Sequence, residues 1–480
     1  MDAAGAQEAG QGTGLAGELA AALARQRAAY ARAPVPSYAE RVADLKALRR
    51  FLTENREALI AAVNADYGCR SRHETLFAEF VPVLDGIRHT LRRLRGWMRP
   101  QRRAVDLLLF PGARNRVIAQ PLGVVGVIVP WNFPINLSFS VLTSVFAAGN
   151  RALVKLSENS RHFAALLRER LPRYLPPEKL MVFDETGGVG VEFSRLPFDH
   201  LIFTGSTATG RAVMGAAAAN LTPVTLELGG KSPAILCEDF PLRTAAERIL
   251  FVKLMNAGQI CTTVDYLFLP RAQIAGFAEL AREIVGRRYA NLASADYTAI
   301  IDERSFARLT HALEDARARG ARVLPLLPGE PWDAGSRKIA PHLVLDPPPD
   351  CELMQREIFG PVLPVLGYGE LKEAVDFINA RARPLAFYPF SRRAATVAYL
   401  IEHVMSGGVS VNDALWHVGQ HDLPFGGVGA SGMGHYHGRE GFLTFSKLRP
   451  VFYQARLSGM RMLWPPFSRL AGRLLEFLTR

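Results

Sequence analysis

Short apolar runs alternate with amphipathic segments along most of the chain, and the alternation falls into two consecutive blocks. In the first block, the apolar runs are typical of buried strands and lie at residues 123–129, 152–156, 179–184, 200–203 and 223–228. Between them, apolar residues recur every three to four positions, which predicts helices at residues 134–148, 162–171 and 207–219. Strands buried on both faces and joined by helices form parallel sheets. The first block is therefore predicted to be an α/β unit.

The second block repeats this pattern after Gly229-Gly230. Strands are predicted at residues 234–237, 264–269, 340–344 and 359–366. Helices are predicted at residues 242–255, 274–289, 304–319 and 371–380. Because the two glycines separate the last strand of one block from the first strand of the next, we expect a hinge there. The pattern thus predicts an α/β protein of two domains with a cleft between them.

The N-terminal segments that precede the blocks are helical in pattern. Helices are predicted at residues 17–33, 37–67 and 73–99. Ser37 at the start of the second, with Glu40 three residues later, is the signature of a capping box. Residues 1–14 are rich in alanine, glycine and glutamine and are interpreted as a disordered lead-in.

Two other segments stand outside the alternation. The runs at residues 105–110 and 116–120, joined by Pro111-Gly112-Ala113, predict a protruding β-hairpin, which is a candidate for subunit contact. Residues 456–480 mix apolar side chains with arginines, so we consider an amphipathic tail that touches a membrane surface or gates a substrate. Because Pro465-Pro466 splits this tail, packing on the protein's own surface is the slightly favoured interpretation.

Composition narrows the class of protein. The 480 residues carry a formal net charge of +12, mostly from arginines scattered over many segments, and no nucleic-acid motif accompanies them. The four cysteines are far apart and lack metal-ligand spacing, so free thiols, no metal site and a reducing, cytoplasmic compartment are expected. The uncharged run at residues 117–150 is long enough to cross a bilayer, but its prolines, glycines and asparagines favour a folded core.

Three residues are candidates for catalysis. Cys261 lies between a helix-like run and a predicted strand, where it is either a core cysteine or a sulfur presented into the cleft. Asn132, within Pro130–Pro134 at the end of the first strand, is either an amide donor to an oxyanion or an Asx turn. Glu227 ends an apolar strand, where burial would raise its pKa toward that of a general base; the alternative is an ion pair with Lys231.

Two further motifs are typical of dinucleotide sites. Gly205, Ser206 and Gly210 lie where a strand meets a helix, so their backbone amides either approach a phosphate or form a tight turn capped by Ser206. Lys155 and Glu158 follow another strand and either hold ribose hydroxyls or form a surface ion pair.

Taken together, the motifs resemble the NAD(P)-dependent aldehyde dehydrogenase superfamily. They occur in one order: PWNFP, KLSE, FTGSTATG, ELGGK, GQIC, EIFGP and PFGGVGASG. The resemblance extends from about residue 17 to about residue 451. The segment 434–447 is similar to the class 3 branch and, within it, to bacterial coniferyl-aldehyde dehydrogenases, with fatty-aldehyde and benzaldehyde enzymes close by. One departure is Leu156, where the family has a proline.

The resemblance implies oxidation of an aromatic or apolar aldehyde to the acid, with Cys261 as nucleophile, Asn132 and the Cys261 backbone N–H as oxyanion donors, and Glu227 as base. It implies NAD or NADP as cofactor, without deciding between them, and a homodimer. The residues implied to bind the cofactor are Trp131, Lys155, Glu158, Gly205, Ser206, Gly210, Glu357 and Phe359. Tyr436, Trp416 and His417 are guesses at the substrate lining.

The family fold implies a Rossmann-like cofactor domain (residues 15–103 and 122–229), an α/β catalytic domain (230–432) and a small β bridging or oligomerisation element (104–121 and 433–455). Three alternatives stay open. The substrate could be a fatty or medium-chain aldehyde, the acceptor could be coenzyme A in place of water, or the chain could be a catalytically retired homologue. Glu227 argues for water, and the retained Cys261, Glu227 and Asn132 argue against a retired homologue.

Overall fold

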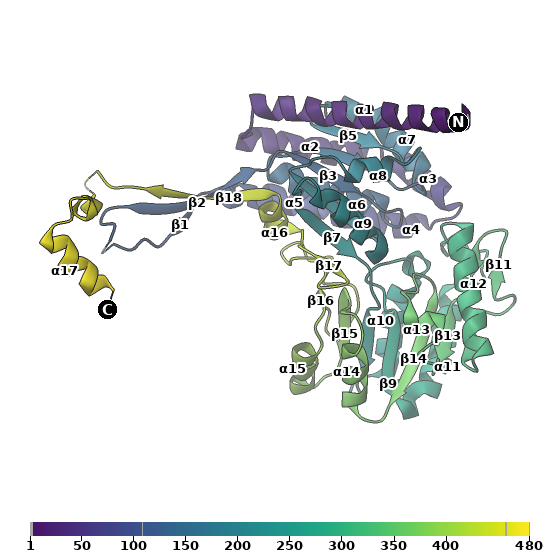
Figure 1. The fold of residues 1–480 in the computed structure, drawn as a ribbon. Helices are drawn as coiled ribbons and strands as arrows, with labels where there is room; N and C mark the ends of the chain where they lie inside the picture. Colours follow the sequence, from purple (N-terminus) through teal and green to yellow (C-terminus); the bar gives the residue numbers. More distant parts are fainter. Residues whose placement is uncertain (1–2, 108, 457, 480) are drawn as a thin grey trace.

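The computed structural model describes residues 3–107, 109–456 and 458–479. Figure 1 shows two α/β units, one above the other, with a long arm that leaves the upper unit and carries the C-terminus away from the body. Every strand predicted for the two blocks is present to within a few residues at each end, so the α/β prediction is confirmed.

The upper unit contains a six-stranded sheet in the order β17-β7-β6-β3-β4-β5. All neighbours run parallel except β17 and β7. The strands are β3 (Val124–Ile128), β4 (Arg151–Lys155), β5 (Leu180–Phe183), β6 (His200–Gly205), β7 (Val224–Leu228) and β17 (Gly432–Met433). The connecting helices are α6 (Pro134–Ala147), α7 (Arg161–Arg170), α8 (Val189–Ser194) and α9 (Thr207–Ala218).

The strand order creates a switch point in this sheet. From β3 the chain moves outward to β4 and β5, and then returns to the other side of β3 for β6 and β7. Open α/β sheets bind ligands at the carboxyl ends of the strands that flank such a switch. The fold therefore places a binding crevice where Pro130–Pro134 follows β3 and where Ser206 follows β6.

The lower unit contains a seven-stranded sheet in the order β10-β13-β14-β9-β8-β15-β16, parallel except for β10. Its strands are β8 (Pro233–Leu236), β9 (Tyr266–Pro270), β10 (Arg322–Pro325), β13 (His342–Leu345), β14 (Val362–Tyr368), β15 (Ala386–Phe390) and β16 (Gly408–Val409). Its helices are α10 (Leu242–Leu254), α11 (Ile274–Arg288), α12 (Glu303–Ala318), α13 (Glu352–Gln355), α14 (Leu371–Asn379) and α15 (Ala394–His403). A two-stranded ladder pairs β11 (Trp332–Asp333) with β12 (Lys338–Ile339). The sequence pattern missed β15, because Pro389 lies within it and proline is unusual inside a sheet.

Helices from the N-terminal part cover the upper sheet. They are α1 (Ala3–Arg32), α2 (Tyr38–Glu54), α3 (Arg56–Tyr67), α4 (Arg72–Thr75), a π-helical turn (Leu76–Phe80) and α5 (Val81–Trp97). The capping box is confirmed: the Ser37 N–H donates to Glu40 Oε2 at 2.7 Å, and the Glu40 N–H donates to Ser37 Oγ at 3.3 Å. For residues 3–14 the predicted disorder is wrong, because α1 already begins at Ala3, and residues 1 and 2 lie outside the described residues. Alanine has the highest helix propensity, which explains why this segment extends the anchored helix.

The arm is a three-stranded antiparallel sheet in which β2 (Arg114–Pro121) lies between β1 (Gln101–Arg103) and β18 (Ser446–Tyr453). The strand predicted at residues 105–110 is wrong for the described residues of that segment, and residue 108 lies outside them. The Phe110 N–H donates to the Asp106 carbonyl at 2.8 Å, as in a turn, and β1 precedes the segment.

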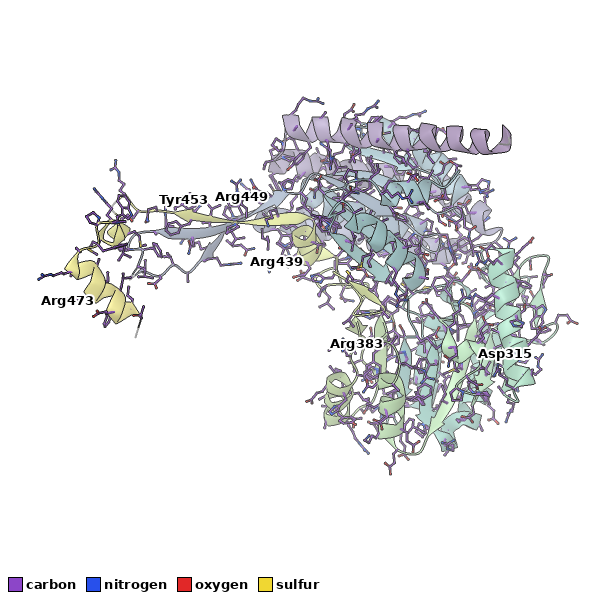
Figure 2. All side chains as sticks on the ribbon, in the orientation of Figure 1. Asp315, Arg383, Arg439, Arg449, Tyr453 and Arg473 are labelled. Atoms are coloured by element: carbon purple, nitrogen blue, oxygen red, sulfur yellow. The ribbon has the colours of Figure 1, made fainter. Side chains whose placement is uncertain are left out.

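Beyond the arm lie a 3₁₀ turn (Gly459–Leu463) and α17 (Arg469–Leu478), and Figure 2 shows Arg473 far from the body. Helix α16 (Gly438–Thr444) returns the chain from the body to β18. Among the described residues, no helix is long and apolar enough to cross a membrane. The long uncharged run forms the end of β2, all of β3 and α6, as the breakers in it predict.

Candidate active site

The backbone around Cys261 is sharply bent. Helix α10 ends at Leu254, and the next residues include three in left-handed conformations: Asn256 at φ 52°, Ala257 at φ 49° and Gly258 at φ 74°. A β-carbon at position 258 would lie 2.2 Å from the Gly360 carbonyl oxygen, so only glycine fits. Strain of this kind persists where the surrounding structure enforces it. The bend carries Cys261 to the cleft between the two units.

Two buried amide side chains hold this bend. Asn256 Nδ2 donates to the Tyr67 hydroxyl at 3.1 Å and to the Gln259 carbonyl at 3.2 Å. Gln259 accepts the Ile301 N–H at 3.0 Å and donates back to the Asn256 carbonyl at 3.0 Å. The cysteine loop is thus tied both to helix α3 and to the lower unit.

Asn132 follows β3 and faces the same cleft. Its carbonyl accepts Arg70 Nη1 at 2.8 Å and the Tyr67 hydroxyl at 3.0 Å, and its Nδ2 donates to the Gln259 carbonyl at 3.2 Å. An amide nitrogen carries two hydrogens, so one donor of Asn132 is left for a ligand. The network places this amide beside the cysteine loop.

Arg70 and Glu79 form a buried pair that the sequence reading missed. Their side chains are fully buried and 3.1 Å apart, and Glu79 Oε2 accepts the Ile135 N–H at 2.7 Å. The available signal was a carboxylate within an apolar helical segment, but its partner lies on another element. The pair fixes the start of α6 directly after Asn132.

A cleft of about 830 Å³ lies between the units, and eight of the eleven predicted site residues line it. They are Trp131, Asn132, Gly205, Ser206, Glu227, Cys261, Glu357 and Phe359. The hinge residues Gly229 and Gly230 also line it.

Glu227 is the last but one residue of β7 and is 3 % exposed. Neither carboxylate oxygen has a hydrogen-bond partner among the described residues, and burial raises the pKa of Glu227 well above its ordinary value. The proposed pair with Lys231 is wrong. Lys231 Nζ instead contacts Asp265 and donates to the Leu353 carbonyl at 2.7 Å. Glu227 therefore faces the cleft without a neutralising cation.

Burial also raises the pKa of the Cys261 thiol, to about 12, and the carboxylates of Glu357 and Glu227 act in the same direction. The Thr262 side chain and the backbone N–H of Cys261 act in the opposite direction. The thiol is therefore protonated at neutral pH in the protein alone.

Glu357 and Phe359 lie on a loop that Asp265 and Lys231 hold. Asp265 Oδ1 accepts the Ile358 N–H at 3.0 Å, and burial, with the Asp265 charge, raises the pKa of Glu357 to about 8. Glu357 Oε1 has no hydrogen-bond partner among the residues described. The Phe359 backbone has φ 52°, and its ring meets that of Trp131 edge to face at 5.4 Å.

The start of α9 faces the cleft as predicted. Ser206 caps the helix by accepting the Thr209 N–H at 3.2 Å, and Thr207 and Ala208 line the cleft beside it. Gly210 is the exception: it lies outside the cleft and packs on Leu228, where a β-carbon would approach Cδ2 to 2.6 Å. Its position in the helix turns it toward β7.

Lys155 and Glu158 lie at a corner next to the cleft, and they do not pair with each other. Lys155 contacts Glu185, whereas the exposed Glu158 accepts the Ser157 hydroxyl at 3.1 Å.

The sequence reading also missed the cations on the lower lip of the cleft. They are Lys231, Arg308, Arg356, Arg381 and Arg383, the last of which is labelled in Figure 2.

Comparison with known proteins agrees with this geometry. The model of the aldehyde dehydrogenase family matches residues 11–451. The chain belongs to the aldehyde dehydrogenase family. It is 48% identical to a Pseudomonas aeruginosa protein named probable coniferyl aldehyde dehydrogenase, over 95% of each chain. It is 37% identical to the rat "Aldehyde dehydrogenase, dimeric NADP-preferring", over 90% of this chain and 94% of the other. Among solved structures, Staphylococcus aureus AldH in a substrate-bound state superposes with a TM-score of 0.89 at 32% identity, covering 96% of this chain and 99% of that one.

A dinucleotide suits this aldehyde dehydrogenase cleft. Free N–H groups at the first turn of α9 bind phosphate oxygens, and the cations on the opposite lip complement phosphate charge. Gly229 is in close contact with the Glu357 carboxylate, because a β-carbon at position 229 would be 2.2 Å from Glu357 Oε2. The unpartnered Oε1 of Glu357 is an acceptor for a hydroxyl, such as that of a ribose. The residues present therefore fit NAD or NADP.

Three aromatic side chains form an exposed aromatic patch near the cysteine loop: Phe77, Phe251 and Trp416. They are 42, 40 and 37 % exposed, with ring centroids 5.9–6.3 Å apart. A small apolar cluster of Phe133, Met255 and Ile260 contacts Ala78 and Leu415, the chain neighbours of Phe77 and Trp416. This cluster connects the aromatic patch to the residue before Cys261.

The other two guesses at the substrate lining lie deeper. Tyr436 is 1 % exposed, and burial, with the charges of Glu227 and Cys261, raises its pKa well above the ordinary value. The ring of His417 and the Ser410 hydroxyl form a hydrogen bond of 2.8 Å, and burial lowers the pKa of His417 to about 4. Neither residue lines the cleft.

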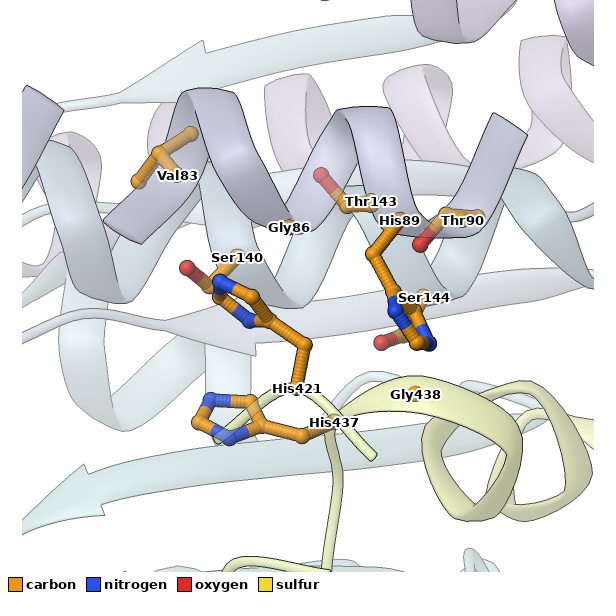
Figure 3. A pocket seen from close by; sticks show the side chains of 10 residues that line it. All are labelled: Val83, Gly86, His89, Thr90, Ser140, Thr143, Ser144, His421, His437 and Gly438. Carbon is orange, nitrogen blue, oxygen red and sulfur yellow. The ribbon is translucent and has the colours of Figure 1, made fainter. Parts of the chain in front are cut away.

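A second, small pocket of about 20 Å³ has three histidines in its lining (Figure 3). His89 comes from α5, and His421 and His437 come from the loops that precede α16. Burial lowers the pKa of His437 to about 3 and also lowers the pKa of His421. These two rings are therefore neutral at pH 7, and the pocket is large enough for about one water molecule.

Proposed function

We propose that the chain oxidises an aromatic aldehyde of the coniferaldehyde type to its carboxylic acid with NAD⁺ or NADP⁺. The observation that carries this is the meeting of Cys261 with Glu227, a buried carboxylate without a partner among the described residues, in one cleft that also receives Asn132. A nucleophile, a base and an oxyanion donor are what acyl chemistry at an aldehyde carbon requires.

In this proposal the Cys261 thiol first loses its proton to water, and the sulfur, as thiolate, then forms a bond to the aldehyde carbon. The Asn132 amide and the Cys261 backbone N–H donate to the oxygen, which becomes negative as that bond forms. When bound, NAD(P)⁺ accepts the hydride, and its positively charged ring favours the thiolate. Cys261 then holds the acyl group as a thioester. Glu227 removes a proton from water, the hydroxide oxygen bonds to the acyl carbon, and the thiolate leaves.

The chain's own residues would hold the dinucleotide at three places. Ser206 and the N–H groups that follow it would contact phosphate, Glu357 a ribose hydroxyl, and Trp131 with Phe359 the ring end of the cofactor. Lys155 and Glu158 would face the adenosine ribose, because they follow the second strand from the switch point. Gly210 would act only through packing of α9.

Two findings favour an aromatic substrate. The Pseudomonas relative carries the name of a coniferyl aldehyde dehydrogenase, and the aromatic patch offers ring faces and edges at the surface. Aromatic pairs gain about 0.5–1.5 kcal/mol beyond area burial. An aromatic aldehyde at this patch gains that energy, whereas an aliphatic aldehyde gains only the energy of area burial. A fatty or medium-chain aldehyde is the second candidate, because the lining of the patch is apolar.

The test is formation of NADH or NADPH with coniferaldehyde, benzaldehyde and hexanal, followed by absorbance. We expect coniferaldehyde to give the highest kcat/KM. The variant Trp416→Ala should raise KM for coniferaldehyde by about tenfold relative to hexanal, since about 1.4 kcal/mol corresponds to tenfold. Tyr38→Ala, which removes an exposed aromatic at the start of α2, is the matched control and should change neither.

Several outcomes would contradict the proposal. Turnover of hexanal above both aromatic aldehydes would favour the chain-aldehyde candidate. Absence of turnover with all three, in protein that binds the dinucleotide, would favour a retired homologue. Formation of an acyl thioester with added coenzyme A, at the expense of free acid, would replace water as the acceptor.

We also propose that two copies of the chain associate through the arm, and that the protein is cytoplasmic. The arm exposes Phe452 and Tyr453, the rat relative is named dimeric, and all four cysteines are free. Domain boundaries at residues 103, 121, 229 and 432 are part of this proposal.

The tail exposes Trp464, Phe467 and Phe477 and is proposed to make weak membrane contact. A vesicle flotation assay in which a variant ending at Ala455 behaves like the full chain would contradict that contact.

A further inference from the structure

The end of strand β4 carries a cation that the chain itself neutralises. Lys155 is the last residue of β4, and its side chain is 9 % exposed. Its Nζ contacts the carboxylate of Glu185, whose side chain is 21 % exposed. Glu185 follows the neighbouring strand β5, whose Phe183 is the register partner of Lys155. The pair therefore joins the carboxyl ends of two adjacent parallel strands.

Backbone contacts hold Glu185 in this position. The Gly190 N–H donates to Glu185 Oε2 at 3.0 Å and lies 3.3 Å from Oε1. A β-carbon at position 190 would be 2.8 Å from Glu185 Oε2 and 3.2 Å from Lys155 Nζ. Glycine at position 190 thus allows the backbone to approach the side chains of both Glu185 and Lys155. Glu185 cannot leave Lys155 without giving up a hydrogen bond to the backbone.

The fold gives this corner a specific place relative to a dinucleotide. In doubly wound sheets, the residues after the second strand face the adenosine ribose, where a carboxylate accepts from the 2′-hydroxyl and a cation accommodates a 2′-phosphate. Counted from the switch point, β4 is that second strand. Lys155 and Glu158 therefore stand where the two cofactors differ.

Most of the other charged side chains near Lys155 already have interaction partners. Arg168 Nη1 contacts Asp184 at 3.0 Å, and Arg161 Nε donates to the Glu158 carbonyl at 3.2 Å. Glu158 itself forms no ion pair within the described part of the chain and is exposed. Like charges placed close together repel, and a 2′-phosphate would add nearly two negative charges beside two carboxylates.

We propose that Glu185 makes this enzyme prefer NAD⁺ over NADP⁺ by occupying the Lys155 ammonium that would otherwise pair with a 2′-phosphate. This inference rests on the dinucleotide-dependent function proposed above. Glu158 serves the 2′-hydroxyl of NAD⁺, and Glu185 acts on selectivity through Lys155 without touching the cofactor. Glu185 is thus a positioning residue.

The test is calorimetric titration of the full-length protein with NAD⁺ and with NADP⁺. We expect the wild type to bind NAD⁺ at least about tenfold more tightly. Glu185→Gln keeps an oxygen for the Gly190 N–H but removes the charge, and should tighten NADP⁺ binding by about tenfold while NAD⁺ binding stays within about threefold. Asp184→Asn is the matched control, because it removes the same charge one residue earlier, where the partner is Arg168. It should leave the ratio of the two affinities unchanged.

A second variant tests whether the gain in NADP⁺ affinity requires the Lys155 ammonium or only the loss of a negative charge. Lys155→Met combined with Glu185→Gln buries no unpaired charge and should bind NADP⁺ no better than the wild type. Should Glu185→Gln fail to fold in a thermal melt, Glu185→Asp replaces it, because the shorter side chain withdraws from Lys155; about a threefold gain for NADP⁺ is then expected.

The inference is overturned if Glu185→Gln leaves the ratio of affinities unchanged, or if Asp184→Asn shifts it equally. It is also overturned if the wild type binds NADP⁺ as tightly as NAD⁺. Binding of neither dinucleotide would overturn this inference and the proposed function together. Selective NAD⁺ binding that responds to Glu185→Gln, in a protein that oxidises no aldehyde, would support this inference and overturn only the proposed function.

Discussion

The catalytic end of the proposed site, around Glu227, and its ribose corner, around Lys155, treat charged groups in opposite ways. At the catalytic end, Glu227 and Lys253 are buried without hydrogen-bond partners for their charged atoms among the described residues. Burial raises the pKa of Glu227 well above its ordinary value and lowers the pKa of Lys253 to about 8. At the ribose corner, which is proposed above to face the adenosine ribose, Lys155 meets Glu185 and Arg168 meets Asp184. Charged groups thus lack hydrogen-bond partners among the described residues at one end and are paired at the other.

Leaving a buried polar group unpaired costs about 1–3 kcal/mol, so the catalytic end needs support from elsewhere. Two clamps provide it. Arg70 with Glu79 holds the backbone around Asn132, and Lys231 with Asp265 holds the loop that carries Glu357. The proposed base Glu227 is therefore unpaired among the described residues, whereas the residues that position its neighbours in the cleft are paired.

The largest effect is expected at the nucleophile. Cys261→Ser should lower aldehyde turnover by about 10⁴-fold or more, because a serine hydroxyl without an adjacent base is a weak nucleophile. Binding of the dinucleotide, measured by titration, should stay near the wild-type value, since the ribose corner is untouched. Oxidation at a wild-type rate in this variant would remove Cys261 from the mechanism and with it the contrast between the two ends.

Replacement of the base should separate the two halves of the reaction. In Glu227→Gln, we expect steady turnover to fall by about 10³-fold, within the range found for general bases. Rapid mixing should still give a burst of reduced cofactor close to one per active site, because the thioester forms before water is activated. The absence of any burst would place Glu227 in the first step instead.

The pH profile sharpens this prediction. Glu227 works as a base only when deprotonated, and its raised pKa places deprotonation at higher pH than for an ordinary glutamate. Steady turnover of the wild type should therefore continue to rise with pH beyond the range in which an ordinary glutamate ionises. A profile that stays flat from pH 6 to pH 9, at saturating substrate, would contradict the assignment of the base, since an ordinary glutamate with a pKa of about 4.3 is already ionised there.

The sequence allowed the fold to be predicted for definable reasons. Apolar runs at residues 123–129 and 223–228 are long enough to identify buried strands. The structure brings Cys261, Asn132 and Glu227 into one cleft, and their catalytic roles stay a prediction. The pairing of charges was not predictable in this way. Lys231 meets Asp265, 34 residues away, and not the nearby Glu227.

Two errors have a similar origin. The hairpin register was misjudged because β2 pairs with β18, more than 300 residues later in the chain, and local turn signals do not contain that partner. The helix from Ala3 was missed because glycines in that segment reduce helix propensity, whereas Leu19 and Leu23 further along α1 anchor it on the sheet. In both cases the structure depends on contacts between residues that are far apart in the sequence.

At the ribose corner a smaller effect is expected. Glu158→Gln should weaken NAD⁺ binding by about tenfold, because a hydrogen bond to a charged acceptor contributes about 1.5–3 kcal/mol and the amide keeps part of it. The rate at saturating cofactor should stay near the wild-type value. A drop in that rate, with binding unchanged, would mean that this corner reaches the reacting atoms and would break the division between the two ends.

The smallest effect is expected on stability. The pKa of Glu357 is raised to about 8, from an ordinary value of about 4.3, so the folded protein holds this proton more tightly than the unfolded chain does. Its contribution to stability is complete below pH 4, is lost as pH rises toward 8, and is absent in Glu357→Gln. Melting temperatures measured from pH 5 to pH 9 without cofactor should therefore fall less steeply in this variant, by a few degrees over the range. Glu158→Gln, an exposed carboxylate, is the control and should follow the wild type. Equal slopes in all three proteins would mean that Glu357 is already ionised at neutral pH, and that the catalytic end carries one charge more than the structure implies.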